Sequence, residues 1–332
     1  DYDFVFVGDP QISTTAHGDE WIDTLEKIDK NFDVEFIVSA GDQITTPDSE
    51  EQYDLFIADK LASNAVATTI GPVHDSYGSQ GKGTAYSEHY NLPNESSEYG
   101  VTMAGGNYWY IYNDTLFMNI NFEAGTTAQL AQHEEFIRET INANPNTTWQ
   151  VVIVHAPFFA TSYHASDANT VNIRKKLAPV FADVGIDVVL SGHEHLYARS
   201  QLMLDSTTVS DDVVTDNYVI SPKGVQYICA SSSTGSKFYE KGYNGNDGYI
   251  AAENYEHRKS AIHFEVTDTS FAITSYFLDD MSVFDTFTIY NTEDAVHTAG
   301  TAVKENEVAA TCKAEGSYDE VVYCTECKAE LS

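Results

Sequence analysis

Short apolar segments alternate with longer amphipathic segments along the first 190 residues of the chain. The apolar segments, which we expect to be strands, are Phe4–Val7, Phe36–Ser39, Ala65–Ile70, Leu116–Phe122, Gln150–Val154 and Asp187–Leu190. Several are apolar throughout, which is typical of strands buried on both faces. The segments with helical spacing are Asp19–Asn31, Ala128–Ala143 and Asn172–Asp183. This order predicts an α/β sheet with helices packed on its outside.

Side chains that can bind a metal ion follow five of these strands, at the point where each strand ends. They are Asp9, Asp42, His74 with Asp75, His155, and the pair His193 and His195. Ligands of open α/β sheets bind outside the carboxyl ends of the strands, so we expect these side chains to gather at one rim of the sheet. A mixture of Asp and His suits Zn, Mn or Fe. The sequence therefore predicts a transition-metal site at that rim.

These motifs also resemble a known family. Gly8-Asp9, Gly41-Asp42, Gly71 with His74-Asp75, His155 and Gly192-His193-Glu194-His195 follow the order and spacing of the calcineurin-like metallophosphoesterase superfamily. The segment Leu196-Tyr197-Ala198-Arg199 is most similar to its purple acid phosphatase branch, and the resemblance covers roughly residues 1–290. It implies a β-sandwich flanked by α-helices and a binuclear metal centre that hydrolyses phosphate esters.

The resemblance assigns metal-binding roles to five residues. Asp42 would bridge two divalent or trivalent transition metal ions, which we expect to be Fe, Mn or Zn. Asp9 and His195 would complete the first ion's ligands, and His155 and His193 those of the second. Two cations about 3.5–4 Å apart activate a bridging water, so the expected nucleophile is a metal-bound hydroxide.

Three further residues are candidates for contact with the substrate. His74 and His164 match substrate-facing histidines of the family and are the expected acids that protonate the leaving group. Arg199 is a candidate contact to the substrate phosphate, and an ion pair with one of the many carboxylates is the alternative. The expected substrate is a small phosphomonoester or phosphodiester.

The sequence departs from the family pattern at three positions. Gln11 stands where a histidine ligand is usual, Thr45 where purple acid phosphatases have a tyrosine, and Val73 where an asparagine binds the second metal. Gln11 and Asp75 are therefore candidates for a weak metal or substrate contact, and a water or a weak second site is the alternative. These departures keep a second function open: a non-catalytic surface or binding protein that retains the fold.

The amino-acid composition makes some classes of binding partner unfavourable. The 332 residues include 17 basic and 51 acidic ones, and the formal net charge is −34. Broad contact with nucleic acid or an anionic membrane is therefore disfavoured by repulsion, although a metal ion can still attract a small anion. The sequence contains no run of 18 or more apolar residues, so we expect no membrane-spanning segment, and we expect no signal peptide within the sequence. Nothing in the sequence indicates the oligomeric state.

After Tyr290 the chain is rich in small and acidic residues. We therefore place a boundary between residues 1–291 and a small module of residues 292–332. The module holds His297, Cys312, Cys324 and Cys327, a set that predicts a structural zinc site or a disulfide. It resembles a Cys-containing module of secreted or wall-attached proteins of Gram-positive bacteria. That resemblance implies a secreted or cell-surface location for this chain.

Overall fold

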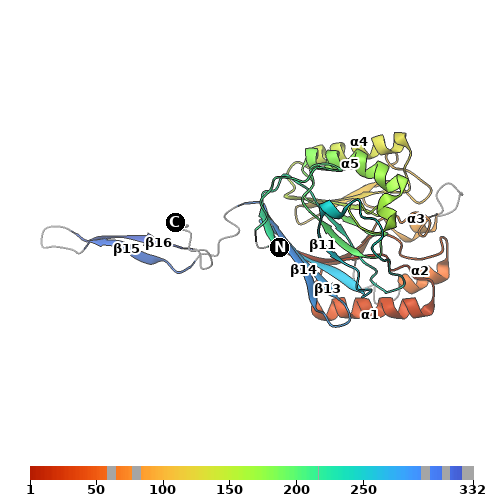
Figure 1. Ribbon diagram of the computed structural model, residues 1–332, viewed down its shortest axis with the longest axis horizontal. Coiled ribbons are helices and arrows are strands. Elements are labelled where there is room, and N and C mark those ends of the chain that lie inside the picture. Colours follow the sequence, from red (N-terminus) through yellow and green to blue (C-terminus); the bar gives the residue numbers. More distant parts are fainter. Residues whose placement is uncertain (58–64, 77–83, 216, 293–299, 309–314, 324–332) are drawn as a thin grey trace.

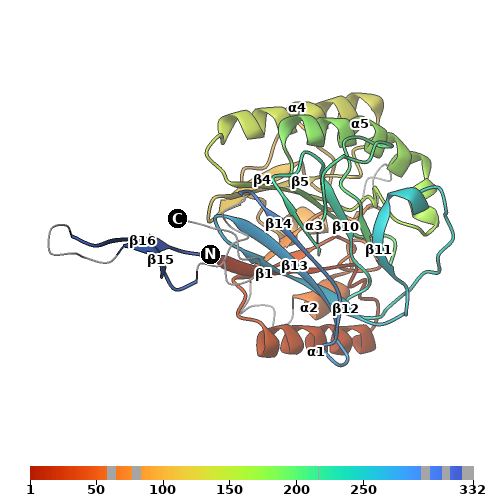
Figure 2. The same cartoon turned by 60° about the vertical axis from the view of Figure 1, so that its left-hand side comes forward.

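The computed structural model describes residues 1–57, 65–76, 84–215, 217–292, 300–308 and 315–323. Two seven-stranded sheets pack face to face, and helices cover the outer faces of both (Figures 1 and 2). The β-sandwich flanked by α-helices that the resemblance implies is therefore the fold of this chain.

The first sheet has the strand order β3-β2-β1-β12-β13-β14-β9. Its strands are β1 (Tyr2–Val7), β2 (Phe36–Ser39), β3 (Ala65–Thr68), β9 (Tyr218–Ile220), β12 (Ser260–Val266), β13 (Ser270–Phe277) and β14 (Val283–Tyr290). β1, β2 and β3 run parallel to one another, so their carboxyl ends meet at one edge. β12 pairs antiparallel with the other side of β1.

The second sheet has the order β11-β8-β10-β7-β6-β5-β4. Its strands are β4 (Tyr108–Tyr112), β5 (Thr115–Ile120), β6 (Trp149–Val154), β7 (Val188–Ser191), β8 (Tyr197–Ser200), β10 (Gln226–Cys229) and β11 (Ile250–Asn254). β5, β6, β7 and β10 are parallel, so this sheet too brings the carboxyl ends of its central strands together.

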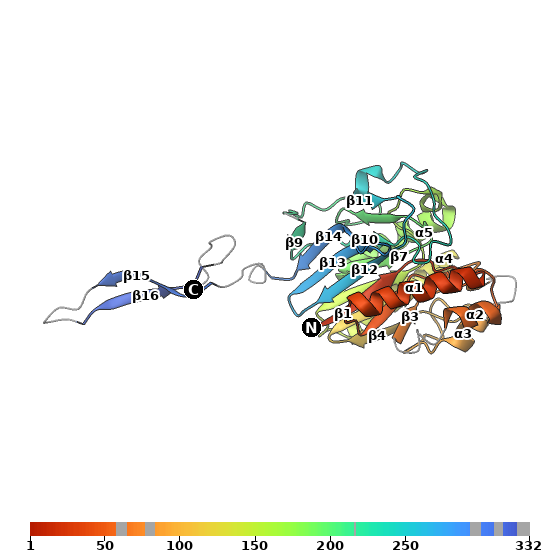
Figure 3. The ribbon, with the colours of Figure 1, turned by 90° about the horizontal axis from the view of Figure 1, so that it is seen from below.

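The helices lie on the two outer faces. They are α1 (Thr15–Asn31), α2 (Glu50–Phe56), α3 (Ala85–His89), α4 (Thr127–Ala143) and α5 (Ala168–Val184), with 3-10 turns η3 (Tyr163–Ser166) and η4 (Asp247–Tyr249). α4 and α5 pack on the second sheet, and Figure 3 shows α1 across the outer face of the first. α1 begins before Asp19 because Thr14 caps it by accepting from the backbone N–H of His17.

Each central strand is buried on both faces because it separates two cores. In β1, Phe4 and Phe6 point between the sheets, whereas Val5 and Val7 point toward α1. In β6, Val151 and the other odd-numbered residues face the same inter-sheet core, and the even-numbered ones face α4 and α5. This two-sided burial is the physical reason for the apolar runs in the sequence.

The expectation of one sheet with one rim is wrong in one respect. The first three predicted strands lie in the first sheet, and the next three lie in the second. An apolar run predicts burial on both faces, but a strand beneath a helix and a second sheet is buried just as fully as one between two helical layers. The run therefore cannot indicate how many sheets the strands form.

Residues beyond 292 are described only in part. β15 (Val303–Val308) and β16 (Ser317–Val321) form an antiparallel pair that lies apart from the sandwich (Figure 1). His297, Cys312, Cys324 and Cys327 lie outside the described residues, so the zinc or disulfide site remains a prediction. Among the described helices, none is both long and apolar enough to cross a membrane.

Candidate metal centre

The predicted ligands lie on loops that leave the two sheets at the same end of the sandwich. Asp9 follows β1 and Asp42 follows β2, whereas His155 follows β6 and His193 follows β7. Asp9, Asp42, His193 and His195 all have positive φ, between 33° and 73°. Residues other than glycine rarely adopt this left-handed conformation, and such residues cluster at functional sites. The loops are therefore turned sharply to aim these side chains at one point.

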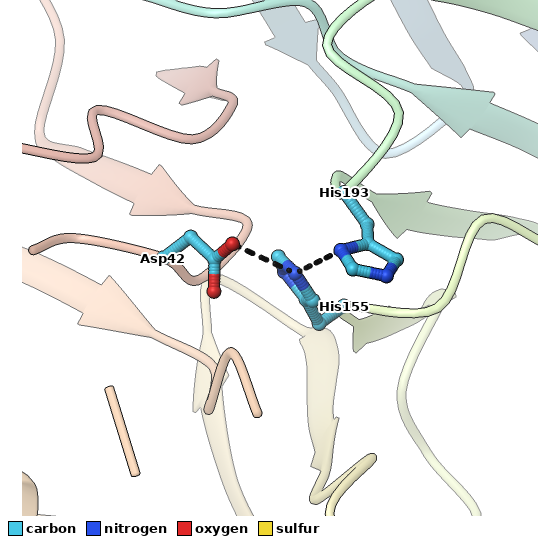
Figure 4. Close-up of side chains that lie close together, drawn as sticks. All are labelled: Asp42, His155 and His193. Atoms are coloured by element: carbon cyan, nitrogen blue, oxygen red, sulfur yellow. Dashed lines mark hydrogen bonds and ion pairs between the residues drawn. The ribbon is translucent and has the colours of Figure 1, made fainter. Parts of the chain in front are cut away.

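One group of potential ligands consists of Asp42, His155 and His193. Their ligand atoms all lie within 4.8 Å of one another. Nε2 of His155 is 3.4 Å from Oδ2 of Asp42 and 3.1 Å from Nδ1 of His193 (Figure 4). Nδ1 of His155 donates to the carbonyl of Ala40 at 2.8 Å, since a carbonyl can only accept. This hydrogen bond fixes the ring and leaves Nε2 facing the centre, as in metal-binding histidines.

A second group consists of Asp9, Asp42 and His195, again with ligand atoms within 4.8 Å of one another. The backbone N–H of His193 donates to both carboxylate oxygens of Asp9, at 2.9 and 3.0 Å. Nδ1 of His195 donates to the carbonyl of Lys237 at 3.0 Å, so its Nε2 faces Asp9. The structure thus brings together both triads expected from the sequence, and Asp42 belongs to both.

The Asp42 carboxylate tests whether these residues fit a cation. Asp42 is buried, and its Oδ1 has no hydrogen-bond partner among the described residues. A Cβ added at Gly71 would lie 1.9 Å from that oxygen, so only glycine leaves room for it. A buried, unpaired carboxylate oxygen is unfavourable by itself and becomes favourable when it binds a positive charge. The donor set of two carboxylates and three imidazoles therefore fits transition metal ions.

The protonation states of Asp9, Asp42 and His155 depend strongly on one another. Burial raises the pKa of Asp42, but the charge of His155 and its hydrogen bond lower it more, so the pKa lies below the usual range. Burial lowers the pKa of His155, and Asp42 and Asp9 raise it to about 10. Burial, opposed by His155, raises the pKa of Asp9 to about 7. A proton on His155 therefore offsets part of the negative charge of Asp42 and Asp9. A bound cation would neutralise the same carboxylates and replace that proton.

The other two imidazoles favour the neutral form. Burial, followed by repulsion from His155, lowers the pKa of His193 well below the usual value. Burial lowers the pKa of His195 to about 4. Neutral imidazoles carry the lone pair that a metal ion needs, so these two residues are ready to act as ligands near neutral pH.

Asp75 and Gln11 have other roles than the metal contacts considered for them. The carboxylate of Asp75 accepts from three backbone N–H groups, those of Asp42 at 2.7 Å, Gly71 at 2.8 Å and Gln43 at 2.9 Å. It therefore holds the two loops together, and Asp75 belongs to none of the potential ligand groups found among the described residues. Nε2 of Gln11 makes a long contact of 3.5 Å with Oδ2 of Asp42, so the amide is a donor to a ligand.

The two candidate acids lie at the edge of the centre. Nδ1 of His74 donates to the carbonyl of Thr45 at 2.8 Å, and Nε2 has no hydrogen-bond partner among the described residues. Nδ1 of His164 lies 2.8 Å from Oδ2 of Asp167, and its ring stacks on His193 at 4.1 Å between centroids. Both histidines are partly exposed and can approach a substrate held by the central residues.

His164, Asp167 and His193 are also close enough to be considered as a third metal-binding group. The two rings are stacked 4.1 Å apart with only 26° between their planes, so their lone pairs lie in separate, nearly parallel planes, which is unfavourable for binding one ion between them. Nδ1 of His164 is also already paired with Asp167. We therefore interpret Asp167 as the residue that orients His164.

Arg199 has the alternative role that the sequence allowed. Its Nε and NH2 groups contact the carboxylate of Asp285 at 2.6 and 3.0 Å, and its guanidinium covers the ring of Phe287. Arg199 is buried on β8, and its charge is already paired. The structure therefore does not support a contact between Arg199 and the substrate phosphate.

Three neighbours of the centre were missed from the sequence. Asp167 follows His164 by three residues, a spacing that is too common to indicate a pair. Glu194 is buried between the two histidines of its motif and accepts from the N–H of Ala165, which anchors η3. Tyr239 lies 5.0 Å from the ring of His195, in a segment whose sequence carries no recognisable motif.

Comparisons with known proteins agree with this geometry. The family model described as "Calcineurin-like phosphoesterase" matches residues 2–197, which include the four strands that carry the ligands and the loops that follow them. Purple acid phosphatase 1 of Ipomoea batatas is 29% identical over 119 residues, which are 35% of this chain and 24% of that protein. Purple acid phosphatase 19 of Arabidopsis thaliana is 27% identical over 107 residues, or 27% of its length. The matches thus span about a quarter of these curated relatives.

Two solved structures share the fold at low sequence identity. Purple acid phosphatase PPD1 from yellow lupin seeds is 15% identical with a TM-score of 0.68, and the match covers 89% of this chain and 55% of that one. GAP50 of Plasmodium, described as the anchor in the inner membrane complex, is 12% identical with a TM-score of 0.60, covering 88% and 89%. At these identities the likeness shows the common fold.

Proposed function

Because the chain belongs to the calcineurin-like phosphoesterase family, we propose that it hydrolyses small phosphate esters at a centre of two metal ions. Asp9, Asp42 and His195 would hold one ion, and Asp42, His155 and His193 the other. The observation that carries the proposal is the shared Asp42, whose buried Oδ1 has no partner among the described residues. The Asp42 carboxylate is grouped with His195 on one side and with His155 and His193 on the other. This arrangement suits a ligand that bridges two ions.

The ions and the chain would divide the chemistry between them. When bound, Fe, Mn or Zn ions supply Lewis acids that polarise the phosphate oxygens and lower the pKa of a nearby water. The chain's residues orient and protect the reaction: Asp42 and Asp9 keep negative charge where cations are needed, and Asp75 holds the loop of Asp42 in place. His74 and His164 are placed to give a proton to the departing alcohol oxygen.

The second candidate function is a non-catalytic anchor or binding protein. GAP50 has the same fold and is described as an anchor, so the fold alone does not decide between the two functions. Gln11 and Val73 favour this alternative because neither supplies the usual ligand at its position. Against it, the five remaining ligands lie together in two groups that share Asp42, and a bound cation would satisfy the buried Oδ1 of Asp42, which has no partner among the described residues.

Removal and return of metal would separate these functions. The protein would be stripped with a chelator, supplied with Mn²⁺ or Zn²⁺, and assayed with an aryl phosphate monoester and the matching diester. We expect activity that is lost on chelation, returns with metal, and is absent in His155→Ala. The matched control is His257→Ala, because His257 is an exposed histidine that pairs with Glu240. No turnover in any form after metal loading would favour the anchor, and equal, metal-independent turnover in both variants would contradict the metal centre as the source of activity.

A further inference from the structure

Two tyrosines form a joined aromatic surface at the edge of the metal centre. Tyr163 lies on η3, directly before His164, and is 49% exposed. Tyr239 lies in the segment between β10 and β11. Their ring centroids are 4.9 Å apart with 58° between the planes. We call this pair the tyrosine platform.

The tyrosine platform contacts both a potential metal ligand and a candidate acid. The ring of Tyr239 is 5.0 Å from that of His195 and 5.5 Å from that of His164. The ring of Tyr163 is 4.4 Å from that of His164. Since His164 would protonate the leaving oxygen, the organic part of the substrate attached to that oxygen would lie beside the tyrosine platform.

Exposure of one tyrosine would mean little by itself, because single exposed aromatic residues are common. The tyrosine platform differs because its two rings pack against each other and against histidines of the centre. Nζ of Lys237 also lies 4.6 Å from the ring centroid of Tyr239. A fixed ring loses little conformational entropy when another ring stacks on it.

Lys237 also gives this side of the centre a suitable charge. The formal net charge of the chain is −34, so a phosphate dianion is repelled by most of its surface. Lys237 is exposed, and its backbone carbonyl holds His195. Its ammonium group therefore places a positive charge beside the aromatic surface. The combination suits a ligand that carries a phosphate at one end and an aromatic ring at the other.

We propose that the tyrosine platform determines substrate specificity by stacking on an aromatic ring in the leaving group. The preferred substrates would be phosphomonoesters of alcohols whose aromatic ring is attached at, or one carbon from, the ester oxygen. In the reaction, water adds its oxygen to phosphorus, the bond from phosphorus to the ester oxygen breaks, and the alcohol leaves with a proton. This inference rests on the proposed function, because it names the substrate class of the same site.

Benzyl phosphate and cyclohexylmethyl phosphate form a matched pair for the test. Both release a primary alcohol of similar size, and they differ in whether the ring is aromatic. Aromatic pairs contribute about 0.5–1.5 kcal/mol beyond burial, and each step of about 1.36 kcal/mol is tenfold, so the wild type should favour benzyl phosphate in kcat/KM by about 2- to 13-fold. Tyr163→Ala should bring that ratio close to one, and Tyr163→Phe, which keeps the ring, should preserve it.

Tyr318→Ala is the matched control, because Tyr318 is 47% exposed, has Nζ of Lys304 3.6 Å from its ring centroid, and lies on β16 away from the centre. It should leave the substrate ratio unchanged. A ratio near one in the wild type, or the same ratio in wild type and Tyr163→Ala, would overturn the role of the tyrosine platform. A wild type that hydrolyses neither ester after metal loading would instead contradict the proposed function itself.

Discussion

His133 and His155 are both fully buried, and a nitrogen of each ring is hydrogen-bonded to a backbone carbonyl, yet their surroundings differ in kind. Nε2 of His133 donates to the carbonyl of Ala124 at 2.9 Å, and its Nδ1 accepts from the side-chain amide of Asn107 at 2.9 Å. Both nitrogens of His133 are thus satisfied by neutral partners. Nε2 of His155 instead faces two carboxylates and another imidazole.

The difference shows what distinguishes a structural histidine from a potential ligand. Burial is the same in both places, so it carries no information about metal binding. At His133 each donor meets one acceptor, and a cation would have nothing left to bind. At the centre, acceptors converge and one of them, Oδ1 of Asp42, has no partner among the described residues. Excess acceptors, and not burial, are therefore the sign of a cation site.

The largest effect is expected from Asp42→Asn, which removes the charge shared by both triads. We expect kcat/KM for an aryl phosphate to fall by at least about 1,000-fold, since charge stabilisation at such a centre is a major part of catalysis. The measurement is steady-state kinetics with saturating Mn²⁺. Asp187→Asn is the control, because Asp187 is a carboxylate before β7 that accepts from the N–H of Gln150. Comparable losses in both variants would contradict the special role of Asp42.

Asp75→Ala should cause the largest loss of stability. It leaves three buried N–H groups without an acceptor, and each such group costs about 1–3 kcal/mol. We expect the free energy of unfolding, measured with urea, to fall by at least about 3 kcal/mol. Asp75→Asn, which keeps one accepting oxygen, should lose less. An alanine variant as stable as the wild type would show that the hydrogen bonds of Asp75 do not hold these loops.

The comparison also predicts a pH dependence at His133. Burial lowers the pKa of His133 from 6.5 to about 4, so the unfolded chain binds this proton more readily than the folded one. Its contribution to stability is present above pH 6.5 and is lost as the pH falls toward 4, by on the order of 3 kcal/mol in total. Unfolding in urea at pH 7 and pH 4.5 would measure it. His133→Gln should show a smaller difference between the two pH values, and an equal difference would contradict the assignment.

Val73→Asn should have a smaller, favourable effect. Val73 has a φ of 79° and is 66% exposed, so a β-branched residue occupies a left-handed position and buries little surface in return. Asparagine adopts this conformation more readily, and we expect a gain of about 1 kcal/mol in the free energy of unfolding. If its amide turns inward, the second metal should also bind more tightly. Val73→Ala removes only the branching, so an equal gain in that variant would exclude a specific effect of asparagine.

Removal of residues 292–332 should have the smallest effect. The sandwich and all five potential ligands lie before this boundary, and β14 ends at Tyr290. We expect the shortened chain to keep its unfolding midpoint, the two metal ions of the centre and its kcat/KM within experimental error, and to lose only a zinc ion that the tail itself binds. Loss of activity in a shortened chain that remains folded would show that the tail takes part in the function of the centre.

The sequence predicted the parts of this molecule that depend on local signals. Strands such as Phe36–Ser39 agree with the structure because an apolar run records two-sided burial. Asp42 and His155 could be recognised because each directly follows such a run, and the carboxyl ends of parallel strands meet. The family resemblance then supplied the division into two triads.

The remaining features depend on contacts between distant segments. Asp75 looked like a possible ligand because its motif lies beside the centre, but its direction is set by backbone N–H groups 4 to 33 residues away. The pairing of Arg199 with Asp285 spans 86 residues. Tyr239 has no signal in the sequence at all, because only the folded chain brings it to His195 and His164. Such roles follow from three-dimensional packing and not from spacing along the chain.

The most direct test is the number of metal ions bound per chain. The protein would be loaded with Mn²⁺ or Zn²⁺, freed of excess metal, and measured by elemental analysis as wild type and as Asp42→Asn. We predict about two ions for residues 1–291 of the wild type and less than one for the variant, with His155→Ala retaining about one. A wild type without stoichiometric metal, or an Asp42→Asn variant with as much metal as the wild type, would contradict a binuclear centre bridged by Asp42.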